Sequence, residues 1–349
     1  MDSTTIAVDI AKSVFQVAVS HHPGKVSEHY RFSRSRFKSF FVKHQPARVL
    51  FEACGSAHYW AREFKKQGHE VFLLPPHEVR PYVPRNKTDR TDAKAILEAF
   101  RNKDINTVPV KSVDQHTLAT LHRFRSSYIG QRTARINSTR GILREIGIFI
   151  PSGASRVVPT VIELISDPDS SITDPLRAAL RSACDEITYF KSKIKEIEEQ
   201  LKTISKDDPV VNRLRSIPGI GLLTATAMVA FIGDANRFPS GRHFASYLGL
   251  TPREHSSGSR RHLGSISKRG DKYIRMLLVH GARSVLWSSK KKTNPDRLRI
   301  WALEIERRRG HNKASVALAN KLARTFGLSG LRTACMNQKR RSINISPYP

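Results

Sequence analysis

The chain has 349 residues, 39% of them hydrophobic, which is enough for about two domains with a buried core. Lys and Arg number 60 against 30 Asp and Glu, a net charge of +30 that predicts a polyanionic partner. Nothing in the composition favours a membrane or small-molecule role, although a ribosomal or chromatin protein can carry a similar excess. From residue 251 to the end, the sequence contains 23 basic residues and only 5 acidic ones.

The sequence gives no sign of export or of a disulfide framework. No stretch approaches the roughly 20 apolar residues that a membrane-spanning helix needs, and no signal segment is recognisable at the start. The three cysteines, Cys54, Cys184 and Cys335, lie far apart and outside any CxxC pattern. We therefore expect a soluble protein of a reducing cytoplasm, without a zinc site.

The first hundred residues alternate β-rich runs with helical stretches, which predicts an α/β domain over residues 1–112. The first three runs are close together and indicate an antiparallel meander, and each later run follows a helical stretch. This order is typical of an RNase H-like fold. A Rossmann fold is the alternative, but no GxGxxG follows the first strand. The predicted strands are 6–9, 14–19, 30–32, 48–52 and 70–74.

Four carboxylates fall where such a fold would bring them together. Asp9 ends the first strand and Glu52 ends the fourth, and these two strands are neighbours in an RNase H-like sheet. Asp89 and Asp92 are three residues apart at the start of a helix predicted over 91–100, so they would share one helix face.

Four carboxylates at one point repel each other unless divalent cations are bound. Mg²⁺ prefers oxygen ligands, and two ions about 4 Å apart can hold the attacking and leaving oxygens of a phosphodiester. Singly, Asp9 could be a turn residue, Glu52 a surface charge and Asp89 a helix cap. The joint pattern instead predicts a site for two Mg²⁺ ions, with Mn²⁺ as a substitute.

Residues 113–206 are predicted to form a helical connection. A long helical pattern runs from about 114 to 148, and linkers follow at 151–153 and 167–175. Apolar residues then recur in steps of three and four from Cys184 to Ile204, which is heptad spacing. An intramolecular helical hairpin and a dimer coiled coil both fit, and both can hold together. We expect a homo-oligomer, a dimer or tetramer.

A basic, mainly helical domain is predicted over 207–337, with a disordered tail over 338–349. The segment from Ile217 to Gly221 precedes an apolar helix over 222–232 and resembles the turn of a helix-hairpin-helix. In that motif bare backbone N–H groups approach a DNA phosphate. A plain tight turn is the alternative. The candidate nucleic-acid contacts here are Pro218, Gly219 and Gly221.

A Ser/Gly-rich loop over 256–259 lies between basic residues and is suited to hold a phosphate. A serine in it can simply donate a hydrogen bond, or act as a nucleophile where a metal or cationic neighbours lower its proton affinity. Basic residues on the long helix are further candidates, with a solvated helix face as the alternative. The candidate contacts are Arg253, Arg260, Arg261 and Lys268 near the loop, and Arg123 and Arg132 with Arg101, Arg125 and Arg135 elsewhere.

At these residues the sequence resembles the DEDD transposases of bacterial insertion sequences, the insertion sequence 110 type that includes the Piv invertase. The likeness runs from Val8 to the helix around Arg324. The only visible departure, Cys54 beside Glu52, changes no predicted role. The segments that carry the resemblance are Asp9-Ile-Ala-Lys12, Glu52-Ala-Cys-Gly55, Asn86-Lys-Thr-Asp89 with Asp92-Ala93, Ile217-Pro-Gly-Ile-Gly221 and Gly249-Leu-Thr-Pro252.

The resemblance implies a RuvC-like N-terminal domain, a coiled-coil connection and a C-terminal transposase domain with a helix-hairpin-helix. The family's four acids match Asp9, Glu52, Asp89 and Asp92. Its catalytic serine matches Ser257, although the assignment can slip to a flanking serine. The implied activity is Mg²⁺-dependent DNA cleavage and rejoining through a phosphoserine, in active sites shared between protomers.

The same resemblance implies the partners of the protein. A structured guide RNA from the element pairs with donor and target DNA, so that base pairing supplies sequence choice. The implied location is the bacterial cytoplasm, in association with the nucleoid.

Two other functions remain open. One is a hydrolytic, structure-specific RuvC-like nuclease that uses the acids and water without a covalent intermediate. It predicts that Ser257→Ala stays active while Asp9→Ala does not. The other is a nucleic-acid-binding protein with a vestigial metal site, against which the complete set of acids argues.

Overall fold

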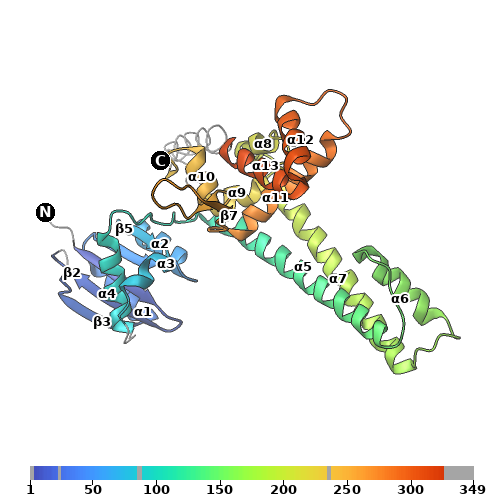
Figure 1. Cartoon of the computed structure of the whole chain (residues 1–349). Coiled ribbons are helices and arrows are strands. Elements are labelled where there is room, and N and C mark those ends of the chain that lie inside the picture. The colour runs from blue at the N-terminus through green and yellow to red at the C-terminus, as the bar shows by residue number, and fades with distance from the viewer. Residues whose placement is uncertain (1–3, 23–24, 85–88, 234–236, 326–349) are drawn as a thin grey trace, which may run out of the picture. The chain divides into compact units, whose positions relative to one another are not determined.

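The computed structural model describes residues 4–22, 25–84, 89–233 and 237–325, without the side chains of Asp89 and Arg90. The chain divides into two compact units, residues 1–113 and 114–349 (Figure 1). The predicted tail over 338–349 lies outside the described residues.

A five-stranded mixed sheet with strand order β3-β2-β1-β4-β5 forms the centre of the N-terminal unit. The first three strands form an antiparallel meander, and β4 and β5 run parallel to β1. The meander and the neighbouring first and fourth strands confirm the sequence prediction, and the sheet is compatible with an RNase H-like domain. The strands are β1 Thr5–Ile10, β2 Val14–Ser20, β3 Glu28–Ser33, β4 Arg48–Glu52 and β5 Glu70–Leu74.

Both faces of this sheet carry a hydrophobic core, because alternate side chains of a strand point to opposite sides. On one face, helices α1 (Arg34–Lys43) and α2 (Ala57–Lys66) pack on β-strand residues such as Phe15, whose ring stacks on Phe37 at 4.2 Å. On the other face, α4 packs on the small side chain of Ala7.

Helix α4 (Asp89–Arg101) contains the helix predicted over 91–100 and begins two residues before it. Ala93, Ile96 and Ala99 are buried in the core that it shares with the sheet. Two short elements precede α4, helix α3 (Pro76–Val79) and the 3-10 turn η1 (Arg80–Tyr82). They continue directly from the end of β5, so they lie at the edge of the sheet where the parallel strands end.

Two long helices, α5 (Val113–Glu145) and α7 (Asp174–Ile204), form an antiparallel hairpin (Figure 1). Leu118 packs with Leu201 in one cluster, and Leu143 packs with Leu180 in another. The residues at heptad spacing therefore pack within one chain, except Ile204, which is 53% exposed.

The linker prediction was wrong in part. Helix α7 begins at Asp174, and Pro175 lies in its first turn, where a missing N–H costs no helical hydrogen bond. Sequence analysis also left out helix α6 (Val157–Ser166), which follows a 3-10 turn, η2 (Ala154–Arg156). Val157, Val161 and Ile165 of α6 are buried against α7.

The rest of the described chain is a helical bundle with a single large core that includes Phe244, Leu278 and Leu318. The predicted helix over 222–232 is confirmed as α9. The Ser/Gly-rich segment, expected to be a loop, is the tip of a β-hairpin formed by β6 (Pro252–Glu254) and β7 (Leu263–Ile266). The helices are α8 Pro209–Arg215, α9 Leu222–Ile232, α10 Gly241–Tyr247, α11 Lys272–Ser289, α12 Arg297–Arg309 and α13 His311–Thr325.

Two further sequence predictions concern the membrane and the cysteines. Within the described residues, no helix is both long and apolar enough to cross a membrane. Cys54 and Cys184 are free thiols, and Cys335 lies outside the described part of the chain.

Candidate functional site

Asp9 and Glu52 lie at the ends of neighbouring parallel strands. Val8 pairs with Phe51, and the two acids are the next residues along β1 and β4. Side chains alternate along a strand, so each acid faces the same side as the residue two positions earlier. Those residues are Ala7 and Leu50, both in the core under α4. The two carboxylates therefore share the α4 face of the sheet.

Asp92 approaches this edge from the first turn of α4, the helix that packs on β1 and β4. Asp92 and Glu52 line one cavity of about 710 Å³. Asp89 opens the same helix, but its side chain is not described. Asp9 and Glu52 thus lie at one edge of the sheet, and Asp92 shares a cavity with Glu52.

The charges of this edge act on the neighbouring thiol. Burial raises the pKa of Cys54, and the negative charges of Glu52 and Asp9 raise it further. These effects all favour the neutral thiol form of Cys54.

The donor chemistry at this edge suits Mg²⁺, which prefers carboxylate oxygens and takes its remaining ligands from waters and substrate phosphates. Among the side chains that the structure describes, no three His, Cys, Asp or Glu groups are close enough to enclose a metal ion. One or two carboxylates together with a phosphate are a usual Mg²⁺ site, so the described residues fit such an ion when the nucleic acid supplies the rest.

Two residues that sequence analysis missed, His77 and Arg80, also line the acid cavity. They come from α3 and η1, just after β5. The ends of parallel strands meet at one edge of a sheet, so the segment after β5 could have been expected beside Glu52. Arg80 gives this acidic edge a guanidinium suited to a phosphate.

Ser257 lies at the tip of the β6–β7 hairpin. It exchanges two backbone hydrogen bonds with Arg260, at 3.2 Å each, which closes a turn containing Gly258 with φ of +56°. Every residue from Pro252 to Ser265 is exposed. Within the described structure, the Ser257 hydroxyl makes no hydrogen bond, so it is available to a ligand.

The neighbouring hydroxyl of Ser256 is already in use. It donates to Glu254 Oε1 at 2.8 Å and accepts from the His262 backbone N–H at 3.2 Å. Both bonds cross or brace the hairpin, which gives Ser256 a structural role. The hydrogen bonds therefore distinguish the two neighbouring serines, which the sequence alone could not: the hydroxyl of Ser256 is bonded within the hairpin, and that of Ser257 is not.

The root of this hairpin is fixed by close backbone packing. Gly249 has φ of +67°, and a Cβ there would lie 2.2 Å from the Arg269 carbonyl oxygen. A Cβ on Gly270 would lie 1.8 Å from the Tyr247 carbonyl oxygen. Arg275 donates to the carbonyls of Leu248 and Arg269, at 2.9 Å each, and ties the same crossing together. A rigid root thus carries an exposed tip.

The predicted Pro-Gly turn connects α8 and α9. Gly219, with φ of +85°, packs against α11, where a Cβ would meet Val285 Cγ2 at 2.8 Å and the Gly281 oxygen at 3.0 Å. Gly221 is different, since nothing lies within 4 Å of a Cβ built on it. Of the two glycines proposed to approach a phosphate, Gly221 is the open one, and Gly219 serves internal packing.

Several of the candidate arginines bind acids of the chain itself. Arg101 pairs with Glu98 at 2.8 Å on α4. Arg125 and Arg135 join α5 to α7 through ion pairs with Glu198 at 2.7 Å and Glu186 at 2.6 Å. These three side chains stabilise helices or hold the hairpin together.

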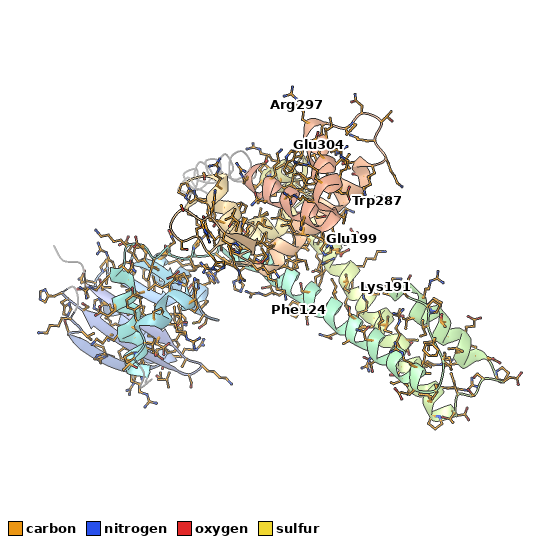
Figure 2. All side chains as sticks on the ribbon, in the orientation of Figure 1. Phe124, Lys191, Glu199, Trp287, Arg297 and Glu304 are labelled. Carbon is orange, nitrogen blue, oxygen red and sulfur yellow. The ribbon has the colours of Figure 1, made fainter. Side chains whose placement is uncertain are left out.

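The other candidates stay closer to solvent. Arg123 is exposed on α5, and Arg260 and Lys268 are exposed near the β6–β7 hairpin. Arg253 donates to the Ser267 carbonyl at 3.3 Å, and Arg261 pairs with Glu254 at 3.1 Å. Arg253, Arg260 and Arg261 belong to the same hairpin as the exposed serine and give that hairpin positive charge. Arg132 lines a cleft between α5 and α7 with Lys191 and Lys195, and Figure 2 shows Lys191 on this hairpin.

The buried residue His122 connects α5 to the bundle. Its Nδ1 lies 3.0 Å from the Tyr273 hydroxyl and its Nε2 lies 3.0 Å from Thr226 Oγ1. Thr226 donates its own proton to the Leu222 carbonyl, so Nε2–H is the donor and Nδ1 accepts from Tyr273. Burial, together with the charge of Arg125, lowers the pKa of His122 to about 4.

Two family models match the chain. Residues 6–148, which contain the four acids, match a model of DEDD transposases of the IS110 type. Residues 211–296, which contain the Pro-Gly turn and the serine hairpin, match the transposase IS116/IS110/IS902 family. The first match thus contains the predicted acids, and the second contains the predicted serine.

Relatives match over nearly the whole chain. It is 40% identical to a probable family 20 transposase of Pseudomonas aeruginosa over 337 residues, which cover 96% of this chain and 99% of that protein. It is 38% identical to the transposase for insertion sequence element IS1111A of Coxiella burnetii, over 92% of this chain and 88% of that one. A pilin gene-inverting protein of Moraxella bovis is 26% identical over 80% of this chain and 81% of its own length.

Proposed function

The chain belongs to the IS110-type DEDD transposases of insertion sequences, enzymes that act on DNA, and we propose that it cleaves and rejoins DNA through a covalent phosphoserine at Ser257. The observation that carries this proposal is the exposed Ser257 hydroxyl, which is free of hydrogen bonds to the described residues. The adjacent Ser256 is committed to Glu254 and His262.

In the proposed reaction the Ser257 oxygen attacks a phosphorus atom of the DNA backbone. The bond from that phosphorus to a deoxyribose oxygen breaks, and the oxygen leaves as a hydroxyl after taking up a proton. A hydroxyl of the partner DNA then displaces serine and restores the phosphodiester. No outside energy source is needed, because the phosphoserine linkage keeps the energy of the broken bond.

The metal requirement of the family is assigned to the acidic edge of the sheet. Asp9, Glu52, Asp89 and Asp92 would hold two Mg²⁺ ions, or Mn²⁺ in their place, and the bound metal would neutralise phosphate charge and lower the proton affinity of the attacking hydroxyl. Arg80 would add a contact to the same phosphate. Support comes from the shared α4 face of Asp9 and Glu52 and from the cavity that joins Glu52 to Asp92.

The proposal divides the chain into a RuvC-like domain over 1–112, a helical connection that dimerises over 113–206 and a transposase domain over 207–337. The acids of one protomer would act with the serine of another. A structured RNA of the element would guide donor and target DNA, with the exposed basic residues of the second unit contacting nucleic-acid backbones. The net charge of +30 supports such polyanionic partners.

A covalent protein–DNA adduct on a denaturing gel tests the serine chemistry. The reaction would contain purified protein, Mg²⁺, RNA transcribed from the flank of the element and labelled donor and target DNA. We expect an adduct with the wild type and with Ser256→Ala, and none with Ser257→Ala, with Asp9→Ala or in EDTA. Ser256→Ala is the matched control, since it removes the same atom one residue away.

Cleavage without an adduct, unaffected by Ser257→Ala, would instead identify a hydrolytic nuclease that uses the acids and water. An adduct that disappears only in Ser256→Ala would move the nucleophile by one residue. Omitting the RNA tests the guide separately, because an unguided enzyme would form the adduct at the same sites without it.

A further inference from the structure

A groove of about 1080 Å³ opens in the second unit among the root of the β6–β7 hairpin, α12 and α13. Most of its lining is apolar, and none of the described residues that line it is acidic. Its charged residues are all cations on one helix, α13. The apolar residues include Leu250, Ile266, Trp301 and Val316, and the cations are Lys313, Lys321 and Arg324.

An aromatic ring and a cation lie together in the wall of this groove. The Lys321 ammonium is 4.0 Å from the centroid of the Trp301 ring. Asn320 donates to the Leu250 carbonyl at 3.0 Å, and its Oδ1 accepts no hydrogen bond from the described residues. The groove thus combines a flat apolar surface, a hydrogen-bond acceptor and positive charge.

These features match the parts of one nucleotide. A nucleobase has flat apolar faces and donors on its edge, and each of its neighbouring phosphates is negative. A base inside a duplex is stacked on both faces, so only an unstacked base can enter such a groove. We propose that the groove binds an unstacked base of single-stranded DNA, with the α13 cations on the flanking phosphates.

Charge argues against an apolar peptide as the occupant. Such a segment would gain nothing from three cations without an acid, whereas DNA neutralises them and releases counterions. The inference rests on the action of the family on DNA and not on the serine chemistry. A failed test of the groove would leave the adduct experiment untouched.

The position of the groove gives the bound base a function. Pro252 and Ile266, at the root of the serine hairpin, belong to its lining. Ser257 comes five positions after Pro252, so the tip is at most about 17 Å away at roughly 3.3 Å per residue. Even at the stacked spacing of about 3.4 Å per nucleotide, the closest spacing along a strand, the held base would lie at most about five nucleotides from the strand position facing Ser257. The base would thus fix the register of the strand.

Photocrosslinking on the full-length wild-type protein locates the base without any variant. A chain with this net charge binds any polyanion, so affinity alone does not identify the groove. The probe is a 15-residue single-stranded DNA containing 5-iodo-2′-deoxyuridine, with crosslinked peptides mapped by mass spectrometry. We expect the crosslink at Trp301. Trp287 is the internal control, because it is 63% exposed on α11 with Lys291 4.2 Å from its ring, outside the groove (Figure 2).

A pair of variants tests the groove by affinity. Ala317→Glu puts a carboxylate into the groove, and Ile300→Glu adds the same charge on α12 at a residue that is 45% exposed and outside it. We expect Ala317→Glu to weaken binding of single-stranded DNA about tenfold at fixed salt. Ile300→Glu should weaken it less than twofold, and duplex binding should change equally in both.

Several results would overturn the proposal. One is a crosslink at Trp287 with none at Trp301. Another is equal single-strand affinity in Ala317→Glu and Ile300→Glu, both with melting temperatures like the wild type. A crosslink at Trp301 that forms only with an iodouridine RNA would assign the groove to RNA and reject single-stranded DNA. Should Ala317→Glu fail to fold, the wild-type crosslink alone decides.

Discussion

Gly219 and Gly221 are two residues apart, yet a side chain would meet opposite surroundings at the two positions. The backbone of Gly219 is in contact with Gly281 of α11, whose own Cβ would lie 2.0 Å from the Gly219 oxygen. Gly221 is the residue before α9, in an extended conformation with φ of −87°, and opens to empty space. Glycine therefore allows close helix packing at position 219, and at position 221 it leaves the backbone open to an approaching ligand.

Substitution by alanine should separate these two roles. Gly219→Ala is expected to lower the free energy of unfolding by about 1–3 kcal/mol, because it forces a positive φ on alanine and a clash with α11. Gly221→Ala should change stability by less than about 1 kcal/mol but weaken DNA binding several-fold, since a methyl group blocks the approach of a phosphate. Urea unfolding and fluorescence anisotropy measure the two effects. Equal losses of stability in both variants would contradict this assignment.

At the scale of elements, the contacts of His122 hold three helices together. The residue lies on α5 and is bonded to Thr226 on α9 and Tyr273 on α11. Because Nδ1 accepts from Tyr273, a proton on that nitrogen would remove the acceptor and put a charge in a site that is 1% exposed. The junction between α5 and the bundle therefore depends on a neutral imidazole.

This junction should make the stability of the protein sensitive to acid. The pKa of His122 is about 4 in the folded chain against a usual value near 6.5, so the unfolded chain takes up the proton first as the pH falls. The contribution of neutral His122 to the free energy of unfolding is complete above pH 6.5. It is lost between pH 6.5 and about 4, which lowers the free energy of unfolding by up to about 3 kcal/mol. Denaturant unfolding of the second unit across this range measures it.

His122→Gln removes the titration and should flatten the dependence on pH over that window. His255→Gln, at an exposed position on the serine hairpin, is the control and should keep the wild-type slope. Equal slopes in the wild type and in His122→Gln would show that other groups cause the acid sensitivity.

Elements with a clear apolar period could be predicted from the sequence, whereas solvent-exposed ones could not. The strands of the N-terminal sheet and helix α9 were found because apolar residues recur at steps of two or form a continuous run. Strands β6 and β7 were missed because both of their faces are in solvent, so no apolar alternation marks them. Helix α6 has buried residues at steps of four, a signal that was present and not used.

The candidate site was predictable where it depends on strand order. The adjacency of Asp9 and Glu52 follows from the first and fourth strands being neighbours. His77 and Arg80 were missed although strand order also indicates that the segment after β5 begins at this edge, a signal that was not used. The distinction between Ser256 and Ser257 depends on hydrogen bonds across the hairpin, and no local pattern in the sequence encodes these.

At the scale of the whole molecule, each of the two units has hydrophobic cores of its own. The sheet carries a core on each face in the first unit, and the bundle and the helical hairpin carry theirs in the second. We therefore expect calorimetry to record two unfolding transitions. The acidic edge belongs only to the first unit, so metal should act on that transition alone.

Millimolar Mg²⁺ should raise the temperature of the N-terminal transition by several degrees, because it binds the folded unit and not the unfolded one. The shift should vanish in Asp9→Asn and persist in Asp104→Asn, an exposed acid of the same unit. A shift that survives in Asp9→Asn, or that appears in the second transition, would place the metal elsewhere. This readout needs no DNA and no activity.

The exposed tip of the serine hairpin has a consequence for the history of the element. The Ser257 side chain is exposed and makes no hydrogen bond to the described residues, so folding sets little condition on it, whereas the proposed reaction requires it. A copy that has stopped moving should therefore accumulate substitutions at this tip first, while its locked root at Gly249 and Gly270 still resists change because the fold needs it. Comparing the two stretches among copies in one genome would date the loss of mobility of each copy.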